Sequence, residues 1–163
     1  IGQIDASMQR AGEFAAGQYN DVKQYILSLG IDKPIHIGET GWATASNGFY
    51  GAEGSQAADE YKAKKYYDYL RKWSNENSIS CFYFEAFDEP WKDAENPMGS
   101  ENHFGLFTVD GKAKYALWSS VDNGIFSGMT RNGNTIEKTF KGYENKLLAS
   151  VLPPIAPKKD INK

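Results

Sequence analysis

The stretch Lys33-Pro-Ile-His-Ile-Gly-Glu-Thr-Gly-Trp-Ala-Thr44 decides the fold that we expect for this chain. Its proline suits the first residue of a strand, because proline has no N–H to donate inside a sheet. Ile35 and Ile37 alternate with a histidine, as in a short strand. Glu39 comes at the expected end of this strand, and Trp42 follows three residues later. A carboxylate beside an exposed indole suits sugar chemistry, whereas the plainer interpretation is a glutamate that caps the next helix.

The four residues Glu39-Thr40-Gly41-Trp42 resemble the nucleophile signature of glycoside hydrolase family 17, the β-1,3-glucanases and related β-1,3-glucanosyltransferases. The family motif is Glu-Ser/Thr-Gly-Trp-Pro, so Ala43 departs from it only at a proline that stiffens the loop. The resemblance implies that Glu39 is the catalytic nucleophile. It also implies β-1,3-glucan or a laminari-oligosaccharide as the partner, no cofactor, and an extracellular, periplasmic or cell-envelope location.

Two further motifs lie downstream. Residues 84–92, Phe-Glu-Ala-Phe-Asp-Glu-Pro-Trp-Lys, are similar to the last barrel strand of the family, and residues 101–107, Glu-Asn-His-Phe-Gly-Leu-Phe, to its Glu-x-x-Phe-Gly-Leu-Phe element. Together with the first motif they cover most of residues 20–118. We expect the substrate-binding residues to be Trp42, Tyr50, Glu85, Glu89, Trp91, Lys92 and Glu101.

Each of these acidic and basic residues has a plainer interpretation. Glu89 and Lys92 alternatively form a surface ion pair, which would be worth under about 1 kcal/mol. Glu101 alternatively caps a turn, and Glu85 alternatively pairs with a lysine elsewhere in a barrel.

The order of the predicted elements indicates an α/β fold. Residues 4–29 have a helical pattern, in which glycines leave open whether there is one helix or two that meet near residues 18–20. A long helix is expected from a cap at Ser55 to about Asn75. A nearly continuous apolar strand follows over residues 79–87, as expected for a strand buried on both faces. This βαβ unit places both strand ends on the same rim.

A complete (β/α)8 TIM barrel takes about 250 residues, whereas this chain has 163 and two convincing strands. The resemblance therefore implies that residues 1–150 are the C-terminal portion of such a barrel, an incomplete barrel with the last two strands and their helices. We also expect a turn at residues 131–134, a short helix at 144–151 whose leucines dock on the outside, and a disordered tail at 151–163.

Composition excludes several kinds of partner. The formal charge is −3 with no basic stripe, which argues against nucleic acid. No apolar run approaches the ~20 residues of a membrane span. His36 and His103 are too few and too far apart to predict a metal site, and Cys81 lies in an apolar run where we expect it to be buried. Aromatic residues make up 14% of the chain, which suits a sugar-binding surface or a tyrosine-rich core equally.

Retaining glycosidases need two carboxyl groups, one to attack the anomeric carbon and one to protonate the leaving oxygen. The family places the proton donor in an Asn-Glu dipeptide on an earlier strand. The only Asn-Glu in this chain is Asn75-Glu76, at a predicted helix end. The general acid/base is therefore expected to be absent from this chain.

Three hypotheses follow for the chain as a whole. The first is the C-terminal part of a retaining β-1,3-glucan hydrolase or transglycosylase, inactive without an N-terminal part. The second is a non-catalytic carbohydrate-binding module that uses Trp42, Trp91, Phe49 and Tyr50 as platforms. The third is a structural fragment that self-associates, because an incomplete barrel leaves open strand edges.

Overall fold

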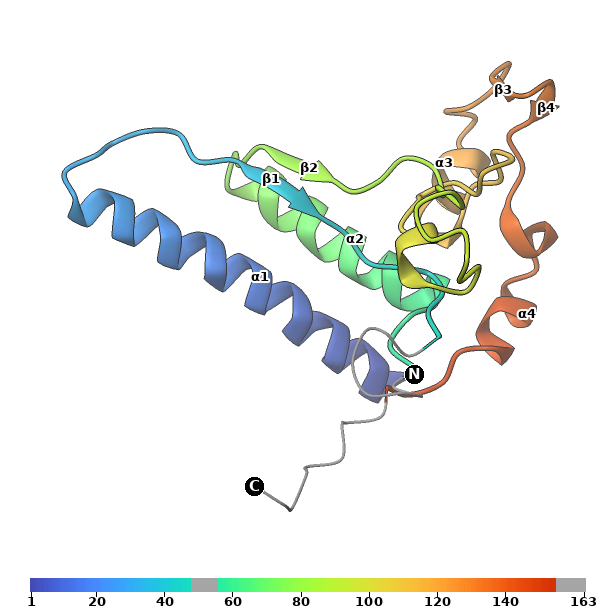
Figure 1. Ribbon diagram of the computed structural model, residues 1–163, viewed down its shortest axis with the longest axis horizontal. Helices are drawn as coiled ribbons and strands as arrows, with labels where there is room; N and C mark the ends of the chain where they lie inside the picture. The colour runs from blue at the N-terminus through green and yellow to red at the C-terminus, as the bar shows by residue number, and fades with distance from the viewer. Residues whose placement is uncertain (48–55, 155–163) are drawn as a thin grey trace.

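The computed structural model describes residues 1–47 and 56–154. Two long helices, α1 and α2, lie beside a short parallel strand pair, and the shorter elements gather at one end (Figure 1). The elements are α1 (Gly2–Ser28), β1 (Ile37–Thr40), α2 (Glu60–Glu76), β2 (Cys81–Tyr83), η1 (Ser100–Asn102), η2 (Tyr115–Leu117), α3 (Trp118–Asp122), β3 (Thr130–Arg131), β4 (Asn134–Thr135), η3 (Thr139–Gly142) and α4 (Glu144–Ala149).

The predicted βαβ unit is confirmed, since β1 and β2 pair in parallel and α2 connects them. Ile37 pairs with Cys81 and Thr40 with Tyr83, with an irregular register between these two pairs. The strand that was expected from residue 35 begins only at Ile37. Glu39 lies inside β1, one residue before its last residue and so close to the expected strand end.

The second strand is shorter than the apolar run over residues 79–87 predicts, because only β2 pairs with β1. Beyond β2 the chain pairs with a different segment. The Glu85 N–H donates to the Phe104 carbonyl (3.2 Å), and the Leu106 N–H donates to the Glu85 carbonyl (2.8 Å). The apolar run thus pairs with β1 at its start and with residues 104–106 further on. The composition of the run does not predict this change of partner.

α1 is one continuous helix of 27 residues, so the two-helix alternative is wrong. Gly12 does not break it but allows α2 to approach: a Cβ at this position would lie 2.2 Å from Cδ1 of Tyr69. Within residues 1–47 and 56–154, no helix is both long and apolar enough to cross a membrane.

α2 begins later than expected. The Asp59 carboxylate accepts a hydrogen bond from the Lys62 N–H (2.8 Å), so that Asp59 is the N-cap that Ser55 was expected to be. Ser55 itself lies outside the described residues. The end of the helix at Glu76 agrees with the expected end near Asn75.

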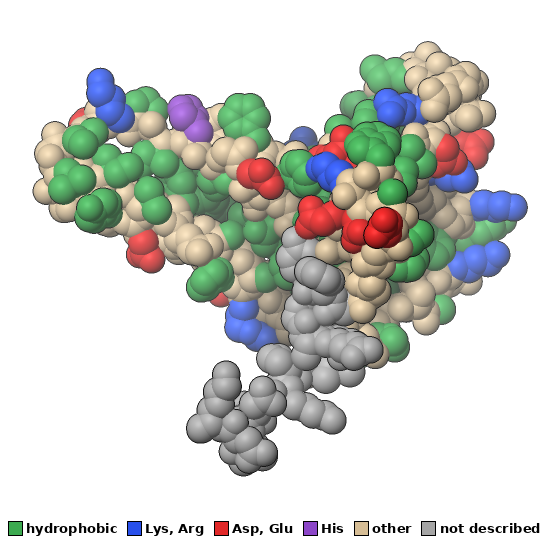
Figure 2. All heavy atoms as spheres, viewed as in Figure 1, with side chains coloured by type: hydrophobic (Ala, Val, Ile, Leu, Met, Phe, Trp, Pro, Cys, Tyr) green, Lys and Arg blue, Asp and Glu red, His purple; other side chains and the backbone are tan. Residues whose placement is uncertain are grey.

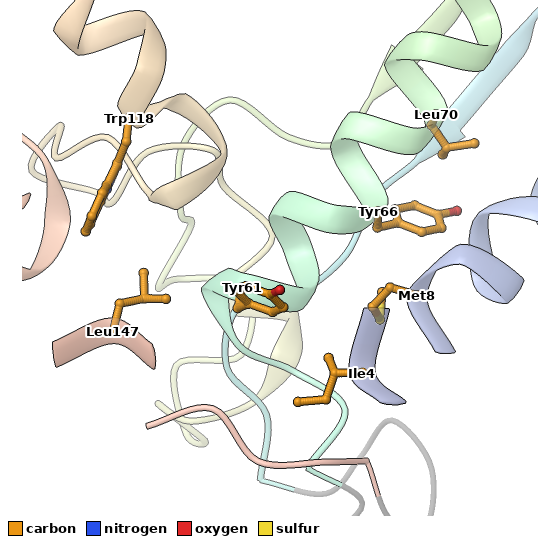
Figure 3. Close-up of a cluster of buried hydrophobic side chains, with 7 residues drawn as sticks. All are labelled: Ile4, Met8, Tyr61, Tyr66, Leu70, Trp118 and Leu147. Carbon is orange, nitrogen blue, oxygen red and sulfur yellow. The ribbon is translucent and has the colours of Figure 1, made fainter. Parts of the chain in front are cut away.

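One hydrophobic core joins the two long helices to the C-terminal elements. The expected docking of the 144–151 helix is confirmed, because α4 places Leu147 in this core at 1% exposure. The predicted turn at residues 131–134 is also confirmed as the β3–β4 hairpin, with positive φ at Asn132 and Gly133. The core side chains are Ile4, Met8, Tyr61, Tyr66, Leu70, Trp118 and Leu147 (Figure 3).

A second apolar stripe, on α1 and the residues just after it, lies outside this core. Figure 2 shows the hydrophobic side chains that gather over the end of α1. Phe82, on β2, is also 63% exposed. An apolar surface of this extent is typical of an interface. The members of the stripe, all between 45% and 69% exposed, are Phe14, Val22, Tyr25, Leu29 and Ile31.

Candidate active site

The ends of β1 and β2 meet, as the βαβ prediction requires. The Phe84 N–H donates to the Thr40 carbonyl (2.7 Å), just beyond the paired strands. A Cβ at Gly41 would lie 2.0 Å from the Phe84 carbonyl oxygen, so only glycine permits this approach. The close contact places the Glu39–Trp42 motif directly beside the motif at residues 84–92.

Glu39 is exposed, and within the described parts of the chain nothing hydrogen-bonds or pairs with its carboxylate. The hydroxyls of Thr40 and Tyr66 lie 2.9 Å apart, so Thr40 faces α2. Glu39 also borders a cavity of about 340 Å³ between α1 and β1, which Tyr19 and Val22 line. The carboxylate is therefore free to contact a ligand.

Lys92 contacts two carboxylates other than that of Glu39. Its Nζ lies 2.7 Å from Oε2 of Glu89 and 3.3 Å from Oε2 of Glu85. It also lies 4.0 Å from the centroid of the Phe84 ring. The alternative ion pair of Glu89 and Lys92 thus exists, and the lysine that pairs with Glu85 comes from the same segment.

The pKa values in this cluster diverge. Burial, followed by a hydrogen bond with Glu89, raises the pKa of Glu85 to about 7. The hydrogen bond from Lys92 lowers the pKa of Glu89. Burial acts to lower the pKa of Lys92, but the hydrogen bonds to Glu89 and Glu85 outweigh it and raise this pKa. The cluster therefore favours one protonated and one ionised carboxyl group.

A buried ion pair that sequence reasoning missed fixes the loops around this cluster. Lys114 Nζ donates to Asp88 Oδ1 and to Thr44 Oγ1, both at 2.6 Å, and the Gly105 N–H donates to Asp88 Oδ1 at 3.0 Å. Lys114 is 4% and Asp88 8% exposed. Burial lowers the pKa of Lys114, and the Asp88 charge opposes this shift. No pattern of residue spacing in a single sequence predicts that residues 88 and 114 form an ion pair.

Trp42 is less accessible than an exposed sugar platform, so the expectation of an exposed indole is wrong. Its Nε1 donates to the Ala57 carbonyl (2.9 Å), and its ring lies 5.0 Å from that of Tyr66. One side of the half-buried indole packs against the core, and the residue also borders a second cavity of about 340 Å³ together with Phe104. Trp91, in contrast, is 62% exposed.

Glu101 is not part of this cluster. Glu101 is exposed in η1, and among the described residues its carboxylate has no hydrogen-bond partner, so the turn-capping alternative is not seen. Tyr50 and Phe49 lie outside the described residues.

The described residues contain no group of three or more histidine, cysteine, aspartate or glutamate side chains that could hold a metal ion. His103 has a structural contact instead, since its Nε2 lies 2.8 Å from the Pro97 carbonyl oxygen.

A parallel βαβ unit whose strand ends carry several carboxylates beside indoles is typical of barrel-type glycoside hydrolases. The family model of the BtgE/BtgC glycoside hydrolase domain matches residues 3–105. The chain therefore belongs to glycoside hydrolase family 17.

Individual relatives agree with this family. The chain is 37% identical over 89 residues to a glucan 1,3-beta-glucosidase of Arthroderma benhamiae, a match that covers 50% of this chain and 27% of the relative. The structure of an endo-laminarinase from Formosa Hel1_33_131 matches with a TM-score of 0.91 and 60% identity, over 99% of this chain and 41% of the other. A Rhizomucor miehei beta-1,3-glucanosyltransferase in complex with laminaritriose matches with a TM-score of 0.54 and 28% identity, over 67% of this chain and 36% of the other. The chain thus spans less than half the length of these relatives.

We predict that Trp42→Ala lowers the free energy of unfolding by roughly 2–4 kcal/mol, because it removes a half-buried ring that packs on the core. Trp91→Ala should change it by less than about 0.5 kcal/mol, because that ring is exposed. Urea denaturation of both variants in a complete enzyme that contains this chain measures the difference. Equal losses would show that Trp42 is not a packing residue.

We predict that Lys114→Met destabilises the fold by about 3–5 kcal/mol, because it leaves the Asp88 carboxylate buried without its cation. Lys112→Met is the matched control. The Lys112 Nζ lies 3.2 Å from Asp110, but both side chains are 51% exposed, so we expect a loss below about 1 kcal/mol. Thermal and urea unfolding measure both, and a loss at Lys114 as small as that at Lys112 would contradict the role of the buried pair.

Proposed function

We propose that this chain is the C-terminal part of a retaining β-1,3-glucan hydrolase or transglycosylase and that Glu39 is its catalytic nucleophile. The observation that carries this proposal is the place of Glu39: an exposed carboxylate near the end of β1 that no described residue pairs with, next to the segment after β2 that bears Glu85, Glu89 and Lys92. The glucan-active relatives described above support the class of substrate.

The carboxylates near the ends of β1 and β2 differ in whether a described residue pairs with them. A nucleophile must reach the anomeric carbon as an anion, and Glu39 is the carboxylate in the family motif that no described residue holds. Glu85 and Glu89 are both held by Lys92. These two residues and Lys92 are therefore better suited to binding or orienting the sugar, as Trp91 is by its exposed ring.

The general acid is proposed to lie outside this chain. Glu76, in its only Asn-Glu dipeptide, is the last residue of α2, where it is exposed and lies 3.8 Å from the Lys72 Nζ. Glu85 has the raised pKa of an acid, but it is mostly buried beside Glu89 and Lys92. The chain also matches only 41% of the endo-laminarinase chain, which leaves room for an acid on an earlier strand.

The same reasoning supports the incomplete (β/α)8 barrel. β1 and β2 provide two parallel strands, whereas a barrel closes with eight. The apolar stripe of α1 and the exposed Phe82 would then be covered by the N-terminal part of the barrel or, in its absence, by another copy of the chain.

We predict that Glu39→Gln, in a complete enzyme that contains this chain, lowers the turnover of laminarin by several orders of magnitude, because the covalent step is lost. Glu137→Gln, which changes an exposed glutamate far along the chain, is the control and should retain full turnover. Azide added to Glu39→Ala should give a glycosyl azide of inverted configuration, as expected when azide enters the space of the nucleophile. More than a tenth of normal turnover in Glu39→Gln would exclude Glu39 as the nucleophile.

We predict that the 163-residue chain alone is silent on laminarin and does not remain a monomer. General acid catalysis typically contributes 10²–10⁴-fold, and the open apolar stripe favours association. A reducing-sugar assay on the purified chain tests its activity, and light scattering tests its association. A stable monomer with turnover would contradict both and would place the acid among the carboxyls of this chain.

A further inference from the structure

The cluster of Glu85, Glu89 and Lys92 has two carboxyl groups for one ammonium. The side chains of Glu85, Glu89 and Lys92 are 13%, 29% and 28% exposed, so water shields their charges incompletely. Two ionised carboxylates would leave one uncompensated negative charge within the cluster. Buried charge without a partner is unfavourable, and the more buried group, Glu85, is the one that gains most from taking up a proton.

The hydrogen bonds of Glu85 lead to the same conclusion. Its Oε1 is buried, and no group in the described part of the chain donates to it. Its Oε2 has the longer of the two Lys92 contacts, at 3.3 Å. An ionised carboxylate would therefore be poorly solvated, whereas a neutral one can share its proton in the hydrogen bond with Glu89. The buried Lys114 also interacts electrostatically with Glu85.

The protonation state of Glu85 affects how many hydrogen bonds Lys92 can donate to a ligand. Its ammonium has three N–H donors. With Glu85 ionised, two of them are directed to carboxylates, while the ring of Phe84 lies against the same group. With Glu85 protonated, Lys92 needs to pair only with Glu89, and one more donor is available to a hydroxyl group.

We propose that Glu85 is a positioning residue of the glucan site, which shares a proton with Glu89 and thereby controls how many Lys92 donors are free to bind a sugar hydroxyl. This inference rests on the proposed function, in which Lys92 contacts the glucan. When the pH rises, the Glu85 carboxyl releases its proton to solvent, its oxygens take a donor of Lys92, and the glucan loses a hydrogen bond. The pKa of Glu85, about 7, places this change near neutral pH.

The test is the affinity for laminarihexaose, measured by calorimetry at about pH 6 and pH 8 on the Glu39→Gln variant of a complete enzyme, which cannot consume the sugar. We expect binding to be about fivefold weaker at the higher pH, the effect of one hydrogen bond. Adding Glu85→Gln should abolish this pH dependence, because an amide cannot ionise. Adding Glu137→Gln instead should leave it unchanged.

A titration of the unsubstituted enzyme makes the test independent of the variants. Carbon-13 labelling of the glutamate carboxyls should show Glu85 titrating near pH 7 and Glu89 far below it. An ordinary titration of Glu85 near about pH 4.5 would overturn the inference. The same holds for an equal pH dependence with and without Glu85→Gln, or for no laminarihexaose binding at either pH. Laminarin turnover by the unsubstituted enzyme is the separate test of the proposed function, so a turnover-competent enzyme with pH-independent binding would refute this inference alone.

Discussion

The buried ion pair between Lys114 and Asp88 is the interaction on which the arrangement of the site depends. It joins three segments of the chain. Thr44 belongs to the loop after β1, Asp88 to the loop after β2, and Lys114 to the segment just before η2. The Gly105 N–H adds the Phe-Gly-Leu-Phe segment. Such a pair contributes little net stability compared with an apolar pair of the same shape, but it is unfavourable to separate. It therefore fixes where the loops lie, and Glu85, Glu89 and Lys92 belong to one of those loops.

A second, partly buried carboxylate connects these loops to the helices. Glu60, at the start of α2, accepts hydrogen bonds from the Tyr115 N–H (2.8 Å) and the Thr139 hydroxyl (2.7 Å). Burial raises its pKa, although both hydrogen bonds oppose the shift. Because η2 begins one residue after Lys114, the first turn of α2 and the ion pair hold the same short element. The charged groups buried here thus orient the loops, while the Glu39 carboxylate at the strand end has no partner among the described residues.

Local patterns in the sequence predicted the parts of the fold that local patterns determine. The helical spacing of α1 and α2, the turn at the β3–β4 hairpin and the docking of Leu147 are each set by periodicity or turn chemistry. Long-range contacts decided the rest. The apolar run after residue 79 pairs first with β1 and then with the segment around Phe104. Trp42 packs inward because its ring contacts Tyr66 and its Nε1 donates to the Ala57 carbonyl. The motifs brought Glu85, Glu89 and Lys92 to one place, but which carboxylates Lys92 contacts depends on side-chain geometry.

The part of the chain beyond the family match belongs physically to the same unit. The match ends at residue 105, yet Lys114, which completes the buried pair, lies after it. Trp118 and Leu147 supply two members of the core, and the Trp118 Nε1 donates to the Ala113 carbonyl and the Thr139 hydroxyl, both at 3.2 Å. If the residues after 105 were only an appendage, residues 3–105 would form the hydrophobic core and the buried ion pair without them. Here both are incomplete without them, so the loops that carry the candidate site depend on residues that the family model does not include.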